Sequence, residues 1–163
     1  MDKVKVFFYN LDSLDKLKQD LPEFKGKLSV KTHFGEPGNT AYIPPQTVKE
    51  LTGDLGDFDF VETTVLYKGP RQTGESHKQV ARDHGFDFAP INIIDGEMGD
   101  EFVAKKIDGV HFKECYLGNG IDDYDSMLVV SHFKGHIAAG FGGALKNLAM
   151  GIGSRKGKLH QHA

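Results

Sequence analysis

Cysteine is nearly absent from this chain of 163 residues, which contains Cys115 alone. A single thiol excludes a disulfide framework, and it excludes any metal or iron–sulfur site ligated only by cysteines of this chain. It also indicates a reducing compartment, so the predicted location is the cytoplasm. No run of about 18 apolar residues occurs, and residues 1–6 lead toward a predicted strand without a signal-type apolar block. Membrane insertion and secretion are therefore not expected.

Acidic residues are absent from the whole C-terminal stretch. All 23 aspartates and glutamates precede Ser126, whereas residues 126–163 carry five lysines and arginines and four of the eight histidines. The formal charge is therefore −8 on residues 1–125 and +5 on the last 38 residues, although the net charge is only −3. A basic segment favours a negatively charged ligand or partner. Packing of this segment against the acidic remainder of the chain is the structural alternative.

The chain is long enough, and apolar enough at 39% hydrophobic residues, to form one hydrophobic core. We expect a single α/β domain over residues 1–163, with residues 140–163 as a functional tail segment rich in glycine, histidine and lysine. Periodicity and turn residues predict strands at 4–9, 28–34, 60–67, 91–94 and 126–131, helices at 14–21, 44–51, 73–84 and 144–150, and a hairpin at 102–117 that turns at Asp108-Gly109. This order indicates a mainly parallel sheet flanked by helices, with an antiparallel hairpin insertion.

Chemically capable residues follow four of the predicted strands. They are His33, Gly35 and Asn39 after the second strand, Lys68 and Arg71 after the third, Asp95 and Gly96 after the fourth, and His132 and His136 after the last. In an open parallel sheet the carboxyl ends of the strands share one edge, where ligands bind. We therefore expect these motifs to converge on one crevice.

The final segment is rich in glycines, which lie on both sides of its predicted helix. Glycine lets backbone N–H groups approach a ligand, and a helix N-terminus favours anions. Gly140, Gly142 and Gly143 are thus candidates for an anion cradle, although the pattern is neither a Walker A motif nor a dinucleotide fingerprint. Lys146 lies in an apolar context that suits a nucleophile, a Schiff base or a covalent anchor. A phosphate-type contact or a snorkelling surface side chain is the alternative.

Histidines supply the candidate acid, base and metal groups. His132 and His136 are four residues apart and could form half of a metal site, although Gly135 between them favours a loop. The candidate catalytic residues are His33, His136 and Lys146, and the candidate metal ligands are His132, His136 and His162, for a divalent ion such as nickel, iron or zinc. A hydrogen-bonded structural role is the alternative for each histidine. No role is assigned to His77, His84 and His111, which have no supporting neighbours.

The remaining site candidates are ligand contacts. Arginine stays protonated, so Arg155, like Lys156 and Lys158, is expected to contact a ligand or partner and not to catalyse. The residues predicted to bind the anionic ligand or cofactor are Gly35, Asn39, Lys68, Arg71, Gly140, Gly142, Gly143, Lys146 and Arg155.

Several runs together resemble the family of uncharacterised iron–sulfur centre proteins. They are Val30 to Asn39, Tyr42 to Pro45, Leu66 to Gly69, Asp95-Gly96, Ser131 to His136 and Gly140 to Asn147. Members of that family are mostly longer, and a ferredoxin-like module with four-iron four-sulfur clusters follows the position of His162. This sequence ends at Ala163 without those cysteines. The resemblance therefore implies either a short member that uses a separate iron–sulfur protein or a fragment.

A more distant resemblance concerns mechanism. His136, Lys146 and His162 fall at spacings of ten and sixteen, with Gly142-Gly143 between the first two. This arrangement is similar to that of nickel-pincer lactate racemases. The resemblance implies an acid/base role for His136, anchoring of a pyridinium-derived cofactor by Lys146, and nickel ligation by His162.

Two functions from different classes follow. The first is binding of a small anionic ligand or metal-bound cofactor at the strand ends, for redox or acid/base chemistry. The second is a non-enzymatic subunit that docks onto a ferredoxin-type iron–sulfur partner through its basic tail. A deep pocket with convergent histidines would favour the first, and a flat basic face the second. Nucleic acid is not an expected partner, because the chain is acidic overall and few aromatic residues accompany the positive charge.

Overall fold

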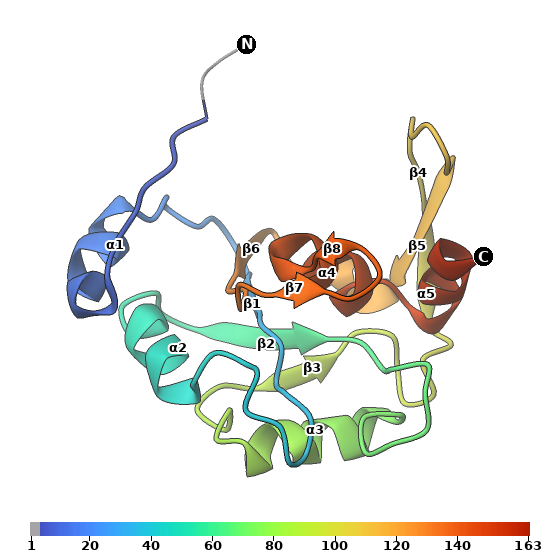
Figure 1. The fold of residues 1–163 in the computed structure, drawn as a ribbon, viewed down its shortest axis with the longest axis horizontal. Coiled ribbons are helices and arrows are strands. Elements are labelled where there is room, and N and C mark those ends of the chain that lie inside the picture. The colour runs from blue at the N-terminus through green and yellow to red at the C-terminus, as the bar shows by residue number, and fades with distance from the viewer. Residues whose placement is uncertain (1–3) are drawn as a thin grey trace.

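The computed structural model describes residues 4–163, and its centre is a four-stranded parallel sheet (Figure 1). The strand order is β3-β2-β1-β6, formed by Ile91–Ile93, Phe58–Glu62, Leu28–Lys31 and Ser126–Val129. Central β1 pairs with β2 from Leu28 opposite Phe58, and with β6 from Leu28 opposite Ser126. All four carboxyl ends therefore point to the same edge of the sheet, and the predicted α/β class is confirmed.

Helices cover both faces of this sheet. They are α1 (Leu14–Asp20, after the 3-10 turn Leu11–Ser13), α2 (Pro45–Thr52), α3 (Gly74–Asp83), α4 (Gly143–Gly151) and α5 (Arg155–His162). On one face, Val30 and Phe60 pack with Val48 of α2 and Ala81 of α3 in the buried core. On the other face, the side chain of Lys31 points toward α4. The strand alternation of Val30 and Lys31 thus separates an apolar layer from a polar one.

Two antiparallel hairpins complete the fold. The predicted hairpin is present as β4 (Phe102–Lys106) and β5 (Glu114–Gly118), although residues 107–113 form its connection in place of a tight turn at Asp108-Gly109. It projects away from the sheet next to α5 (Figure 1). A second, two-residue hairpin joins β7 (Gly135–His136) to β8 (Gly140–Phe141). His136 therefore lies in a glycine-rich hairpin and does not share a helical face with His132.

The strand predicted at residues 4–9 is wrong. These residues form no strand, and Val4, Val6 and Phe8 are 88%, 88% and 91% exposed. The segment has strand-forming residues but no neighbouring strand, and strand propensity expresses packing and pairing more than an intrinsic backbone preference. Residues 1–3 lie outside the described residues.

Helix α5 was not predicted, because its sequence combines a glycine with charged and polar residues and lacks an apolar periodicity. Its N-terminus nevertheless carries a recognisable signal, since the Ser154 hydroxyl accepts a hydrogen bond from the Gly157 backbone N–H at 3.2 Å. The side chain of Lys158 then anchors the helix to the interior. This helix brings two residues of the C-terminal segment, Lys158 and His162, to the edge of the sheet.

Candidate functional site

A cavity of about 320 Å³ lies at the carboxyl ends of β1, β2 and β6. Its walls come from the loop after β1, the loop after β2, the β7–β8 hairpin, α4 and α5. The charged and histidine residues that line it are Lys31, His33, Glu36, Glu62, Arg71, His132, Lys134, Lys146, Lys158 and His162. The cavity thus occupies the edge where parallel sheets usually bind ligands.

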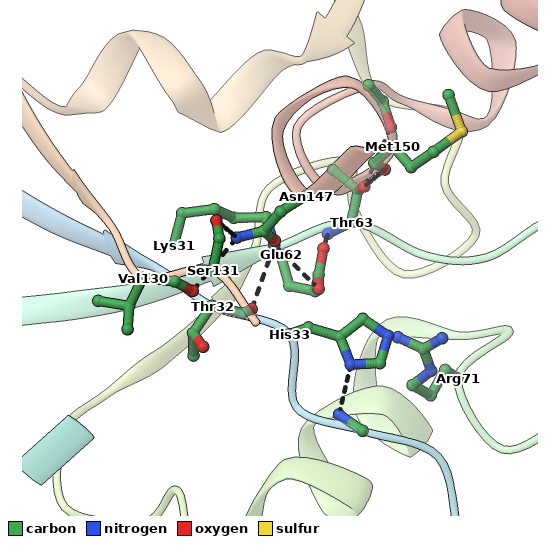
Figure 2. Close-up of polar contacts among 12 residues, drawn as sticks. Lys31, Thr32, His33, Glu62, Thr63, Arg71, Val130, Ser131, Asn147 and Met150 are labelled. Carbon is green, nitrogen blue, oxygen red and sulfur yellow. Dashed lines mark hydrogen bonds and ion pairs between the residues drawn. The ribbon is translucent and has the colours of Figure 1, made fainter. Parts of the chain in front are cut away.

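A buried ion pair forms one side of this cavity (Figure 2). The side chain of Lys31 is 0% exposed, and its Nζ lies 3.1 Å from Glu62 Oε2. Lys31 Nζ also donates hydrogen bonds to Asn147 Oδ1 at 2.7 Å and to the Thr32 carbonyl at 3.1 Å, so each of its N–H groups has an acceptor. Burial opposes ionisation of the Glu62 carboxyl, but the Lys31 ammonium holds its pKa below the usual value. Glu62 is therefore an ionised carboxylate inside the site.

Gly151 permits this arrangement. A Cβ atom at Gly151 would clash with Cε and Nζ of Lys31, so α4 can pass over the lysine only because this position has no side chain. Asn147, one turn earlier in α4, holds the end of β6 by donating to Ser131 Oγ at 2.8 Å and to the Val130 carbonyl at 3.3 Å. Helix α4 is thereby fixed to two strands at the cavity.

Lys158 is a second buried cation, and neutral oxygen atoms surround it. Its Nζ donates to Thr63 Oγ1 at 2.6 Å, to the Thr64 carbonyl at 2.5 Å and to the Gly153 carbonyl at 2.8 Å. No carboxylate of residues 4–163 forms an ion pair with it. Burial lowers the pKa of Lys158 to about 8. The ammonium therefore contributes positive charge that no direct carboxylate contact cancels.

Arg71 lies in the loop after β2, next to a carboxylate. Its Nη2 donates to Glu36 Oε1 and, at 2.6 Å, to the Tyr67 hydroxyl, which itself donates to Glu36 Oε1. Burial opposes ionisation of the Glu36 carboxyl, but the hydrogen bonds from Arg71 and Tyr67 hold its pKa below the usual value. Arg71 Nε is buried and has no hydrogen-bond partner within the described part of the chain.

His33 has one fixed tautomer. Its Nδ1 accepts a hydrogen bond from the Gly35 backbone N–H at 2.8 Å, so the proton of the neutral ring is on Nε2. Figure 2 shows the other edge of the ring directed toward Arg71. Burial lowers the pKa of His33 to about 4, which keeps the imidazole neutral near pH 7. The Nε2 atom of His33, a cavity-lining residue, is therefore a hydrogen-bond donor.

His162 has the opposite tautomer. Its Nδ1 lies 2.6 Å from the Lys158 carbonyl oxygen, which can only accept, so Nδ1 donates and Nε2 of the neutral ring keeps its lone pair. That lone pair can take a proton or bind a metal ion, and a backbone carbonyl is a usual partner for the other nitrogen of a ligating histidine. The two histidines thus present a donor and an acceptor to one cavity.

The structure brings together about half of the residues that the sequence singled out. His33, Arg71, His132, Gly142, Gly143, Lys146 and His162 line the cavity, whereas Gly35, Asn39, Lys68, His136, Gly140 and Arg155 are not among its lining residues. Gly35 acts indirectly by fixing His33, and Asn39 Oδ1 accepts from the Ala41 backbone N–H within the same loop. Arg155 instead donates to the Met98 carbonyl at 3.3 Å.

His136 lies in β7, outside this set. Its Nδ1 accepts hydrogen bonds from the backbone N–H groups of Ala138 and Ala139 at 3.3 and 3.2 Å, which stabilise the turn of the β7–β8 hairpin. The spacing of His136 and Lys146 therefore does not place both side chains in the cavity. Lys146 and His162 do share it.

Lys31, Glu36, Glu62 and Tyr67 are cavity residues that sequence reasoning missed. A signal was present for two of them, since Lys31 and Glu62 are charged residues inside the predicted strands 28–34 and 60–67. Central parallel strands are buried on both faces, so a charge there requires a partner. No comparable signal marks the contact between Glu36 and Tyr67, which depends on how two loops fold together.

The cavity carries an excess of positive charge. Five cationic side chains face two carboxylates, and both carboxylates are already paired, Glu62 with Lys31 and Glu36 with Arg71. Lys134 and Lys146 take part in none of the ion pairs formed by residues 4–163. These two lysines are therefore available to an anion in the cavity.

Metal binding by the side chains of this chain alone has less support than anion binding. Residues 4–163 contain no group of three histidine, cysteine or acidic side chains arranged to hold a metal ion. His132 and His162 both line the cavity, but protein metal sites usually need three or four ligands. A metal held here would require further ligands from water, a substrate or a cofactor.

These features define an α/β protein with a cationic cavity at the carboxyl ends of its parallel strands. Residues 29–163 match the family model described as Domain of unknown function (DUF362), and this match covers most of the chain. The chain therefore belongs to the DUF362 family. No curated protein and no solved structure matches it. Within the described residues, no helix is both long and apolar enough to cross a membrane.

Proposed function

We propose that the cavity binds a small anionic ligand and serves acid/base chemistry on it. The observation that carries this proposal is the charge of the lining, in which five cations face two carboxylates that are already paired. Charges in a partly enclosed cavity interact more strongly than charges on an open surface. The presence of a cavity, in place of a flat basic face, favours this function over the docking module.

The two imidazoles supply the acid/base groups. His33 presents Nε2–H, and its neutral ring can donate a hydrogen bond to an oxygen that gains negative charge. His162 presents the lone pair of Nε2, which can accept a proton from the ligand. A hydrogen-bond donor and a proton acceptor that face one ligand can together support removal of a proton from it.

Lys146 is the residue whose loss tests anion binding most cleanly. Replacing Lys146 with methionine keeps the length of the side chain, so a weakened anion site is expected with little change in folding. With inorganic phosphate as the probe, we expect affinity to fall about tenfold or more, because hydrogen bonds to charged groups contribute roughly 1.5–3 kcal/mol. Isothermal titration calorimetry of wild type and Lys146→Met measures the change.

Lys16→Met is the matched control, because Lys16 is an exposed lysine of α1 outside the cavity. It should bind phosphate as the wild type does. A Lys146→Met variant that binds phosphate as tightly as the wild type would contradict the proposed site. An equal loss of phosphate affinity in both variants would show that only the overall charge of the protein matters.

A metal-bound cofactor is the second candidate, supported by the shared location of Lys146 and His162. Lys146 could anchor such a cofactor and the free Nε2 of His162 could ligate its metal, with the remaining metal ligands supplied by the cofactor. The bound metal would act as a Lewis acid toward a ligand oxygen. His33 would keep its role as a hydrogen-bond donor in that case.

Elemental analysis and intact mass measurement of protein purified without an affinity tag test the second candidate. We expect a stoichiometric divalent metal together with a mass increase that disappears in the Lys146→Met variant. The Lys16→Met protein should retain both. Unmodified mass and no metal in protein purified from its natural source would eliminate the cofactor and leave the anion site.

A further inference from the structure

Only part of the Arg71 guanidinium forms hydrogen bonds. Its side chain is 6% exposed, and its Nη2 contacts Glu36 Oε1 and the Tyr67 hydroxyl. Nε, which shares an edge of the guanidinium with Nη2, is buried without a hydrogen-bond partner among the described residues. Arginine binds a carboxylate best through two parallel N–H bonds along one edge. The edge formed by Nε and Nη2 therefore matches a second carboxylate oxygen that Glu36 does not supply.

Glu36 differs from Arg71 in how firmly it is held. Its side chain is 31% exposed, and it belongs to the loop between β1 and α2, where Gly35 and Gly38 have φ angles of +89° and +76°. Arg71 is anchored by its backbone, since its carbonyl accepts from the Val65 N–H at 3.2 Å. The carboxylate therefore comes from a partly exposed loop, and the receiving arginine is fixed in the wall of the cavity.

We propose that Arg71 and Tyr67 form a carboxylate-binding subsite of the cavity, and that Glu36 occupies this subsite until a ligand carboxylate displaces it. The ligand would take both Nε–H and Nη2–H of Arg71 and the Tyr67 hydroxyl. Glu36 would then move with its loop toward solvent. This inference rests on the proposed anion site and names carboxylates as its ligand class.

Two physical arguments favour displacement over simple addition. A ligand carboxylate that bound beside Glu36 would place two negative charges next to one guanidinium, which is unfavourable. Displacement avoids this repulsion and also gives the buried Nε–H its missing acceptor, whose absence is costly in a folded protein.

The test uses oxalate as the probe and the Nε–Hε signals of arginine in ¹⁵N–¹H NMR spectra. The chain has three arginines, Arg71, Arg82 and Arg155, so the three signals are easily assigned. On titration of the wild-type chain we expect the Arg71 signal alone to shift downfield as Nε–H gains an acceptor. In the Glu36→Gln variant we expect oxalate to bind about tenfold more tightly, because the competing charge is gone.

Glu75→Gln is the matched control, since Glu75 Oε1 accepts from Arg82 Nη1 at 3.0 Å in an exposed ion pair of α3. This variant should bind oxalate as the wild type does. Glu36→Ala provides a second variant in which no side chain can refill the subsite, and it should also bind more tightly.

Four outcomes are informative. Tighter binding in both Glu36 variants with a shifted Arg71 signal supports displacement. Oxalate binding that the Glu36 variants leave unchanged or weaken, with the Arg71 signal unmoved, overturns the subsite while the anion site at Lys146 stands. If phosphate shifts the Arg71 signal as oxalate does, the subsite accepts tetrahedral anions and its assignment to carboxylates is wrong. Absence of phosphate and oxalate binding in every protein overturns both proposals.

Discussion

Replacing Lys31 with methionine is expected to lower the free energy of unfolding by about 3–5 kcal/mol, the usual cost of removing one partner of a buried ion pair. The substitution leaves the Glu62 carboxylate, with a side chain 5% exposed, without its counter-ion. It also removes the hydrogen bond that Asn147 Oδ1 accepts at 2.7 Å, which fixes α4 to β1. Urea unfolding followed by circular dichroism measures the change.

Lys18→Met is the control for this experiment, because Lys18 pairs at 3.1 Å with Asp54, whose side chain is 77% exposed. Such pairs contribute about 0–1 kcal/mol, so the control should change stability little. The double variant Lys31→Met with Glu62→Leu should recover part of the loss, since no buried charge remains unpaired. A loss in Lys31→Met no larger than that in Lys18→Met would contradict the buried pair.

Acidification from pH 7 to pH 5 is expected to destabilise the protein by about 2 kcal/mol for each of two buried histidines, at roughly 1.4 kcal/mol per pH unit below 6.5. Burial lowers the pKa of His33 to about 4 and that of His77 to about 3. Between these values and 6.5, the unfolded chain binds protons that the folded protein does not. Stability is therefore present above pH 6.5 and is lost as the pH falls. Thermal or urea unfolding across this range measures the slope.

The His77→Leu variant isolates the contribution of His77 to the loss of stability at low pH. Both ring nitrogens of His77 are buried without a hydrogen-bond partner among residues 4–163. The ring packs edge-on against Phe34, with 5.9 Å between the two ring centroids. Leucine should remove about half of the destabilisation between pH 7 and pH 5, and it should raise stability at pH 5. The exposed His111→Leu variant should keep the wild-type slope. An identical slope in His77→Leu and wild type would show that His77 does not titrate in this way.

The predictable parts of the fold are those with local signals. Apolar runs predict the parallel strands near residues 28–34, 60–67, 91–94 and 126–131, and periodicity and caps predict the helices between them. All of these elements are present with shifted boundaries. Residues 4–9 have the same composition but no strand to pair with, and pairing is decided by the whole fold. Helix α5 was missed for the opposite reason, since it depends on Ser154 and on the buried anchor of Lys158.

The position of the site in the fold is more predictable from the sequence than the side-chain contacts within it. Parallel strands share a carboxyl edge, so the sequence predicts that His33, Arg71 and His132 lie near one another. The partners of charged residues could not, because they depend on side-chain contacts between distant segments. Lys31 and Asn147, which are 116 residues apart, show this clearly, as do Arg71 and Glu36. Sequence spacing also misplaced His136, whose ring stabilises a hairpin turn.

The most direct test of the anion site is a ¹⁵N–¹H NMR titration of the wild-type chain with inorganic phosphate. We expect the shifted backbone signals to cluster in the segments that line the cavity, at residues 31–36, 62–71, 132–135, 142–151 and 158–162. Signals from the β4–β5 hairpin, which also carries lysines, should remain unchanged. Shifts that concentrate on that hairpin, or that scatter over all exposed lysines, would contradict a specific site at the carboxyl ends of the strands.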